Sequence, residues 1–179
     1  MVSALNPKYF NKANTIYMLL IIMRHGEAAP YQANDREREL TRFGVSQSEV
    51  AGKRLSEFLS KQYLLSSIDH VLVSPYRRTQ QTFSALTEHI KFQAQTNLDE
   101  ITPMGDASEV HDLIDGFANE LEPPKQLMLV SHMPLVSLLS DKVCLGFNGK
   151  FFDTADMLII DYNPDTHRGT QLALYQSMN

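Results

Sequence analysis

The sequence predicts an α/β fold, a three-layer sandwich in which helices flank a mostly parallel central sheet. Short apolar runs, typical of strands that are buried on both faces, occur at 18–23, 71–73 and 127–130. Stretches with helical periodicity alternate with these runs, and this order is typical of a parallel sheet. The chain has 179 residues and 43% of them are apolar, so one domain can bury a sizeable core without disulfides or metals.

In the first half of the chain, two helices follow the first two strands. Thr41 can accept a backbone hydrogen bond at the start of a helix over 42–62, which carries an apolar stripe. The stripe consists of Val45, Ala51, Leu55, Phe58 and Leu59. After the second strand, Ser74 and Pro75 predict an N-cap and a first helical residue, so the next helix is expected to extend to about residue 90.

The second half continues the alternation and ends on two strands. Asp106 can cap a third helix, which has one apolar face. That face consists of Val110, Leu113, Ile114, Phe117 and Leu121. After the third strand, Pro134 opens a helix that Gly146 is expected to end. The last two strands are expected at 157–160 and 172–175, joined through an Asn-Pro-Asp turn.

The domain is expected to span 18–179. Residues 1–17 are polar and show little periodicity, so we interpret them as an N-terminal arm or an upstream start. The alternative is a signal peptide, because two lysines precede the apolar run and two alanines follow it. The run is short for a signal peptide and far too short to cross a bilayer, and cleavage after Ala29 would remove the first strand. We therefore expect a cytoplasmic protein with no membrane partner.

Charge, cysteine content and missing motifs exclude several classes of function. The net charge of −5, without a long basic run, argues against nucleic-acid binding. Cys144 is the only cysteine, so an internal disulfide or a thiolate metal cluster is excluded, and we interpret it as a buried thiol in an apolar helix. The sequence has no His-Glu-x-x-His spacing, no Cys-x5-Arg loop and no Gly-x4-Gly-Lys-Ser/Thr loop. We expect no metal and no cofactor.

Reactive side chains follow each of the three buried strands. Arg24, His25 and Gly26 follow the first, Ser74, Arg77 and Arg78 follow the second, and Ser131 and His132 follow the third. Because ligands of such sheets bind beyond the carboxyl ends of the strands, we expect two imidazoles and at least two guanidiniums at one edge. Taken singly, each histidine could be a hydrogen-bonded core residue and each arginine could lie on a solvated helix face. The prediction of a site depends on their conjunction.

This set of groups is typical of an anion site that contains a nucleophile. Guanidinium binds phosphate through paired, charge-assisted hydrogen bonds and stays charged at any working pH. A neutral histidine can accept a phosphoryl group, and the adjacent arginines are expected to lower the pKa of His25 and keep it neutral. Arg78, one turn into its helix, is expected to project toward the strand end, where the helix dipole favours an anion. Gly26 is expected to let the backbone approach the ligand closely.

Four segments resemble the histidine phosphatase superfamily, which also contains the phosphoglycerate mutases. They are Met-Arg-His-Gly-Glu at 23–27, Leu-Thr and a glycine within 40–44, Leu-Val-Ser-Pro-Tyr-Arg-Arg-Thr-Gln-Gln-Thr at 72–82, and Val-Ser-His-Met-Pro at 130–134. The small size, the Ile-Met-Arg-His-Gly start and Glu-Ile-Thr-Pro at 100–103 are most similar to the small bacterial phosphohistidine phosphatases of this superfamily. The resemblance covers the chain from about Met18 onward and implies a phosphoglycerate mutase-like fold.

The resemblance also implies roles for individual residues. His25 corresponds to the nucleophile, and the residues that hold the phosphoryl oxygens correspond to Arg24, Arg78 and His132. Further residues are candidates to line the pocket: Gly26, Glu27, Ser74 and Arg77. Arg77 occupies a position that varies in the family, and Glu27 could equally be a surface carboxylate.

Glu100 lies near the position of the carboxylate that ester-cleaving members of the family use as a general acid. The surrounding sequence departs from the mutase pattern, so its role stays open. An alkoxide leaving group needs such a proton, worth about 10²–10⁴ in rate. An imidazole leaving group can instead be protonated on its own ring. Only one helix and one strand fit between Glu100 and His132, so we expect no lid subdomain and an open pocket that suits a protein surface.

Three functions are compatible with these residues. The first is a metal-independent phosphatase that acts on phosphohistidine in a signalling or phosphotransfer protein, through a phosphohistidyl intermediate on His25. By resemblance, its partner would be a histidine-containing phosphotransfer protein or domain. The second is a phosphatase of small phosphate esters with Glu100 as general acid. The third is a phosphoprotein-binding module without turnover, and the intact set of histidines and arginines argues against it.

Overall fold

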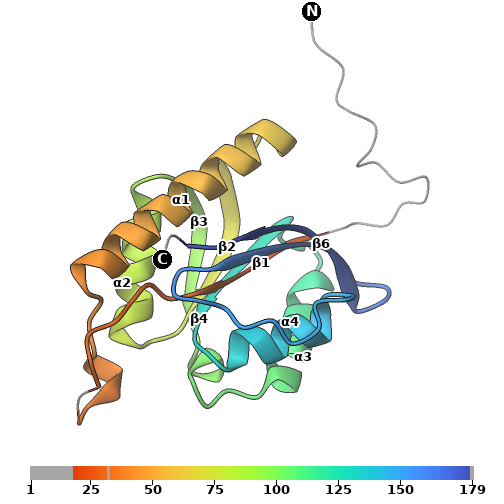
Figure 1. The fold of residues 1–179 in the computed structure, drawn as a ribbon. Coiled ribbons are helices and arrows are strands. Elements are labelled where there is room, and N and C mark those ends of the chain that lie inside the picture. Colours follow the sequence, from red (N-terminus) through yellow and green to blue (C-terminus); the bar gives the residue numbers. More distant parts are fainter. Residues whose placement is uncertain (1–17, 32, 178–179) are drawn as a thin grey trace, which may run out of the picture.

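The computed structural model describes residues 18–31 and 33–177, which form a sheet between two layers of helices (Figure 1). The predicted arm at 1–17 lies outside the described residues. The strands are β1 Met18–Arg24, β2 Ser67–Val73, β3 Lys91–Asn97, β4 Gln126–Ser131, β5 Met157–Asn163 and β6 Arg168–Tyr175. The helices are α1 Arg42–Tyr63, α2 Arg77–Thr87, α3 Ala107–Ala118 and α4 Leu135–Val143, with short 3-10 helices η2 Asp35–Glu37 and η3 Asp99–Ile101.

The strands of the described chain form a six-stranded sheet in the order β3-β2-β4-β1-β5-β6. β1 pairs in parallel with β4, and β2 pairs in parallel with both β3 and β4. β5 runs antiparallel to its neighbours β1 and β6, so within the described residues it is the one reversed strand. The prediction of an α/β fold with a mostly parallel sheet is confirmed.

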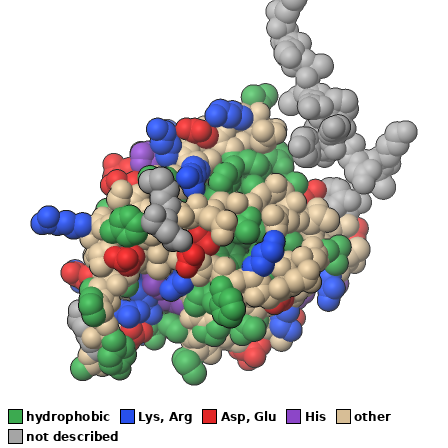
Figure 2. Space-filling model, in the orientation of Figure 1, with side chains coloured by type: hydrophobic (Ala, Val, Ile, Leu, Met, Phe, Trp, Pro, Cys, Tyr) green, Lys and Arg blue, Asp and Glu red, His purple; other side chains and the backbone are tan. Residues whose placement is uncertain are grey.

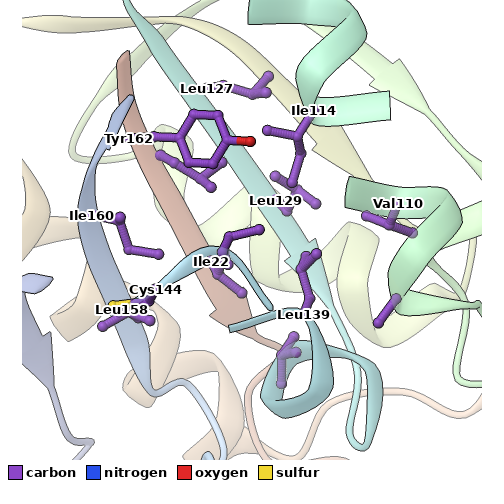
Figure 3. Packing of buried hydrophobic residues seen from close by; sticks show 14 of the residues in the cluster. Ile22, Val110, Ile114, Leu127, Leu129, Leu139, Cys144, Leu158, Ile160 and Tyr162 are labelled. Carbon is purple, nitrogen blue, oxygen red and sulfur yellow. The ribbon is translucent and has the colours of Figure 1, made fainter. Parts of the chain in front are cut away.

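Consecutive side chains of a strand point to opposite faces of the sheet, so the central strands contribute to two cores. On one face, Ile22 packs with residues of α3 and α4, and Figure 3 shows Val110 and Ile114 of α3 directed at the sheet. On the other face, Met23 packs with Leu55 of α1. Each fully buried side chain of this kind contributes about 1.5–3 kcal/mol. Burial on both faces explains why β1 is apolar from Met18 to Met23.

Strand β3 is not among the elements that the sequence predicts. It is an edge strand that pairs with β2, and its side chains are mostly exposed and polar. The central strands are recognised by their apolar runs, and an edge strand exposed to solvent has no such run. The sequence pattern therefore misses it for a physical reason.

The start of α2 differs from the prediction. The helix begins at Arg77, with Tyr76 rather than Ser74 as its N-cap residue, so Pro75 lies outside the helix. The Ser74 hydroxyl lies 2.8 Å from Nε2 of His132 and does not cap the helix. The polar residue that the sequence assigns to a helix end thus serves the neighbouring histidine.

Other helices also depart from their predicted extents. α3 ends at Ala118, which leaves Leu121 fully exposed beyond the helix. α4 ends at Val143, so Cys144 follows the helix, although it is buried as expected. In α1, Val45 is exposed, while the rest of the predicted stripe is buried or partly buried. Among the described helices, none is both long and apolar enough to cross a lipid bilayer.

Candidate active site

The site is built on the carboxyl ends of β1, β4 and β2, which lie side by side. Arg24, the last residue of β1, pairs with Ser131 of β4, and the N–H of His25 donates to the Ser131 carbonyl at 3.0 Å. On the other side of β4, the N–H of Ser74 donates to the Val130 carbonyl at 3.1 Å. The three reactive segments therefore meet at one edge of the sheet, where ligands of α/β folds bind.

His25 is almost fully buried, and both of its ring nitrogens have a partner. Nδ1 lies 2.7 Å from the carbonyl oxygen of Gly26, and Nε2 lies 3.1 Å from Nε of Arg78. A carbonyl oxygen only accepts and a guanidinium only donates, so Nδ1 carries the proton and Nε2 presents its lone pair. His25 is therefore a neutral imidazole with a nucleophilic nitrogen that faces Arg78.

The surroundings of His25 favour this neutral form. Its pKa is lowered to about 3, first by burial and then by the positive charges of Arg78, Arg24 and Arg38. The hydrogen bond to the Gly26 carbonyl acts in the opposite sense but is outweighed. The direction expected from the two neighbouring arginines is confirmed, although burial is the larger cause.

Arg78 is buried in the first turn of α2, and each of its guanidinium nitrogens has a partner. Nε donates to His25, Nη1 donates to the backbone carbonyl of Asp35 at 2.7 Å, and Nη2 donates to its carboxylate at 3.1 Å. The guanidinium also lies over the ring of Tyr76, 4.7 Å from the centroid. The other carboxylate oxygen of Asp35 is 3.3 Å from Nε of Arg38. The segment after β1 thus adds a carboxylate and another arginine to the site.

His132 is buried beside His25, and the centroids of the two rings are 5.1 Å apart. Its Nε2 lies 2.8 Å from the Ser74 hydroxyl, and the Tyr76 ring packs against it edge-on. Burial lowers the pKa of His132, and His25 and the arginines lower it further, so the ring is neutral. Its Nδ1 is buried and has no hydrogen-bond partner among the described residues. A buried polar atom of this kind is available to a ligand.

Arg24 completes the cationic set. Its Nη1 donates to the Phe152 carbonyl at 2.7 Å, while its Nε is buried with no hydrogen-bond partner in the part of the chain that the structure describes. Burial lowers the pKa of Arg24, and the carboxylates of Asp153 and Asp156 oppose this shift. The guanidinium still stays charged, because its pKa starts far above any working pH. Its charge lowers the pKa of both site histidines.

A neutral nucleophilic imidazole among guanidiniums can bind a phosphoryl dianion and accept it covalently. Figure 2 shows histidine side chains reaching the surface among charged side chains at the lower left, where the segments that follow β1 and β2 lie in Figure 1. The described residues contain no group of three or more histidine, cysteine, aspartate or glutamate side chains placed to hold a metal ion.

Comparison with known proteins assigns the chain to a family. The model of the histidine phosphatase superfamily (branch 1) matches residues 20–111. This chain belongs to the histidine phosphatase superfamily. The phosphohistidine phosphatase SixA homolog of Haemophilus influenzae is 36% identical over 122 residues, which are 66% of this chain and 73% of that protein. The phosphohistidine phosphatase SixA of Escherichia coli is 32% identical over 139 residues, 77% of this chain and 81% of that protein.

A solved structure agrees with these sequence matches. The protein histidine phosphatase SixA complexed with tungstate superposes with a TM-score of 0.77 at 29% identity, covering 89% of this chain and 97% of that chain. The superfamily and these relatives place the chain among the phosphatases, which are hydrolases.

In this histidine phosphatase, the small size of Gly26 allows the segment that carries His25 to pack closely against α1. A Cβ on Gly26 would collide with the carbonyl of Gly44, and a Cβ on Gly44 would collide with the backbone of Glu27. The N–H of Gly26 donates to the Thr82 hydroxyl at 3.0 Å, and that hydroxyl donates to the Arg78 carbonyl at 2.8 Å. The glycine expected to make room for a ligand therefore makes room for a helix, and α2 is tied to the same segment.

The candidate general acid Glu100 and two candidates for lining the pocket, Arg77 and Glu27, have no hydrogen bond to the His25 ring in the described structure. Glu100 is exposed in η3, and among the described residues no hydrogen bond or ion pair links its carboxylate to the site histidines. Arg77 is half exposed and pairs with Glu39 at 2.7 Å. Glu27 accepts a hydrogen bond of 2.7 Å from the Thr41 hydroxyl at the start of α1.

Asp35, Arg38 and Tyr76 belong to the site, although the sequence does not single them out. Asp35 and Arg38 lie in the run Asp-Arg-Glu-Arg-Glu at 35–39, and mixed charges of this kind indicate a solvated loop. The contact between Asp35 and Arg78 spans 43 positions, so no local pattern reveals it. Tyr76 is different, because its place inside the motif at 72–82 is a signal that could have identified it.

Proposed function

We propose that this chain is a metal-independent phosphatase that removes phosphate from phosphohistidine in a signalling or phosphotransfer protein. The observation that carries the proposal is the hydrogen-bond pattern of His25, which leaves the proton on Nδ1 and the lone pair on Nε2. Two relatives that are named phosphohistidine phosphatases support the choice of substrate. The proposed partner is a histidine-containing phosphotransfer protein or domain, and the proposed compartment is the cytoplasm.

The reaction would proceed in two displacements at phosphorus. The Nε2 lone pair of His25 attacks in line, a new N–P bond forms, and the substrate N–P bond breaks. The leaving imidazole, protonated on its other ring nitrogen, departs neutral. Water then attacks the phosphohistidyl intermediate, and its oxygen stays on the phosphate that is released. Because the Gly26 carbonyl holds the proton on Nδ1, His25 also leaves as a neutral imidazole in this second step.

Arg24, Arg78 and His132 are proposed to hold the phosphoryl oxygens. Buried guanidiniums stabilise the negative charge that spreads over these oxygens in the transition state. The Nδ1 of His132 can donate to one oxygen when it carries the ring proton. In that tautomer Nε2 of His132 accepts a hydrogen bond from the hydroxyl of Ser74, 2.8 Å away.

Glu100 bears on the alternative function, the cleavage of small phosphate esters. An ester needs a general acid for its leaving group, and Glu100 is exposed without a contact to the site histidines among the described residues. This position supports a phosphohistidine substrate, whose leaving group needs no such acid. A phosphoprotein-binding module would gain nothing from a neutral, nucleophilic His25, so we do not favour that function.

The test measures phosphate release from a purified phosphohistidine protein, a phosphoserine peptide and glycerol phosphate, each with and without EDTA. We expect fast release from phosphohistidine, slow release from the esters and no effect of EDTA. Preference for the esters would favour the alternative function, and a loss of activity with EDTA would contradict metal independence.

Glu100→Gln is the matched variant for the leaving-group argument. If Glu100 supplies a proton to an ester leaving group, this variant will reduce ester cleavage far more than phosphohistidine cleavage, and the alternative function gains support. Because Glu100 is exposed and has no contact with the site histidines among the described residues, we expect little change on either substrate. Equal losses on both substrates would remove this argument.

A further inference from the structure

The carboxylate of Asp35 forms ion pairs with two arginines of the candidate anion site, Arg78 and Arg38. Its carboxylate oxygens lie 3.1 Å from Nη2 of Arg78 and 3.3 Å from Nε of Arg38, and its backbone carbonyl accepts from Nη1 of Arg78 at 2.7 Å. Carboxylate and phosphate oxygens bind the same guanidinium donors. Asp35 therefore uses the hydrogen bonds of Arg78 that a phosphoryl group would need.

The attacking lone pair of His25 is engaged by the same arginine. Nε of Arg78 donates to Nε2 of His25 at 3.1 Å. A phosphorus atom must approach that lone pair to about 3–3.5 Å before a bond can form, so it must take the place of this donor. Asp35 holds the other two nitrogens of Arg78, and the guanidinium cannot turn away from His25 while both contacts persist. The chain of contacts from Arg38 through Asp35 and Arg78 to His25 keeps the site closed.

The segment that carries Asp35 is held by polar contacts rather than by a core. Its two ends are joined by a bridge between Ala28 and Leu40, and η2 between them contains no buried residue. Moving η2 therefore exposes little apolar surface, and a segment of this kind opens at low cost. An exchange of the contacts that its carboxylate makes with Arg78 and Arg38 releases this side chain.

We propose that Asp35 is an internal competitor of the phosphoryl group, which must displace its carboxylate from Arg78 and Arg38 in order to bind. The inference rests on the proposed function only in that it places the substrate anion on these arginines. Competition weakens the binding of every phosphate-like anion. It also assists product release, because the carboxylate returns to the arginines as inorganic phosphate leaves.

The test compares Asp35→Asn with Glu37→Gln, which removes the same charge from the same short helix. Glu37 is exposed and lies 3.9 Å from Arg77, which does not contact His25. Calorimetric titration with inorganic phosphate and with tungstate gives the Kd of each chain. We expect Asp35→Asn to bind both anions about tenfold more tightly than wild type, since a neutral amide competes less for a guanidinium. Glu37→Gln is expected to stay within about twofold of wild type.

Each other outcome decides against the inference. If Asp35 only holds Arg78 in place, its replacement will loosen Arg78 and leave anion binding unchanged or weaker. Either result for Asp35→Asn would overturn the proposed competition. Equal tightening in both variants would indicate a general effect of charge and would also overturn it. If circular dichroism shows that Asp35→Asn is unfolded, Asp35→Ser replaces it in the same titration. If the wild-type protein binds neither anion, the proposed function is overturned as well. If the wild-type protein binds both anions and Asp35→Asn binds them no more tightly, only this inference is overturned.

Discussion

Two pairs of histidines lie at opposite ends of β1 in the described structure, and they differ in the charge of their neighbours. At the carboxyl end, His25 and His132 of the candidate active site lie among arginines. At the other end, where Tyr162 of β5 pairs with the first residue of β1, His111 and His167 surround the carboxylate of Asp115. The same residue type thus lies in two opposite electrostatic environments within one fold.

The second pair is occupied by its own hydrogen bonds. The Tyr162 hydroxyl donates to one oxygen of Asp115, so Nε2 of His111, which lies 2.9 Å from that hydroxyl, must be the donor to it. Nδ1 of His167 lies 2.8 Å from the other oxygen of Asp115. Burial and the nearby carboxylate raise the pKa of Tyr162 and keep it protonated. These contacts tie α3 to the β5–β6 hairpin.

The difference indicates which surroundings leave a histidine able to act as a nucleophile. Among arginines and out of water, a neutral ring keeps a lone pair that a phosphoryl group can use. Beside a carboxylate, a ring nitrogen donates and becomes part of the scaffold. The neighbours therefore decide the role of each histidine, and variants at the two ends of the sheet should separate chemistry from stability.

The largest effect is expected from His25→Ala. Loss of the nucleophile should lower kcat for phosphohistidine cleavage by about 10⁴-fold or more, while the fold is retained. Phosphate release measures the first effect and circular dichroism the second. His167→Ala removes an exposed histidine of the other pair and should keep activity within about twofold of wild type. Near-normal activity of His25→Ala would falsify the covalent mechanism.

Arg78→Lys is expected to give the next largest effect. Lysine keeps the charge but lacks the planar fork whose three nitrogens reach His25 and Asp35. We expect kcat/KM to fall about 10²-fold, a loss typical of one stabilising donor of the transition state. Arg77→Lys, at the half-exposed neighbour, should cost less than about threefold. Equal losses in the two variants would contradict the roles assigned to them.

The parts of the site that the sequence could predict are those encoded next to buried strands. His25, Arg78 and His132 follow apolar runs by two to five positions, so they meet once the three strands lie side by side in the sheet. Asp35 and Arg38 reach the site through contacts between distant segments, and their charged surroundings in sequence suggest a solvent-exposed loop. Their roles depend on tertiary packing that local patterns do not record.

The fold shows the same division. The central strands are buried on both faces and could be predicted from their apolar runs, whereas the edge strand β3 is exposed and could not. Helix α1 begins directly after Thr41, as predicted, and the Thr41 hydroxyl accepts a hydrogen bond from the Gly44 N–H. Helix α2 begins later than predicted, because the Ser74 hydroxyl is used by His132. The N-cap prediction therefore fails at a polar residue whose hydroxyl binds a histidine of the candidate site.

The pH dependence of stability should reveal the environment of His25. The unfolded chain binds a proton on this ring near pH 6.5, and the folded chain does so only near pH 3. Between these values the unfolded state holds more protons, so stability rises with pH and falls as the pH is lowered. From pH 8 to pH 5 this group should cost wild type about 2 kcal/mol of unfolding free energy.

Urea denaturation of wild type and His25→Gln at both pH values measures this loss. The variant should lose less stability than wild type over this interval. The same pH dependence in wild type and His25→Gln would contradict the buried, neutral state of His25.

The smallest effect is expected from Tyr162→Phe at the other end of the sheet. The change removes the hydroxyl that binds Asp115 and leaves the nearby Nε2 of His111 with one acceptor fewer. Leaving such groups without a partner should lower the free energy of unfolding, measured by urea denaturation, by about 1–3 kcal/mol. We expect kcat/KM to stay within about twofold of wild type. Tyr31→Phe, at an exposed tyrosine, is the matched control and should change neither quantity. A fall in kcat/KM without a loss of stability would mean that the second pair of histidines acts on the site, and the separation between chemistry and scaffold would not hold.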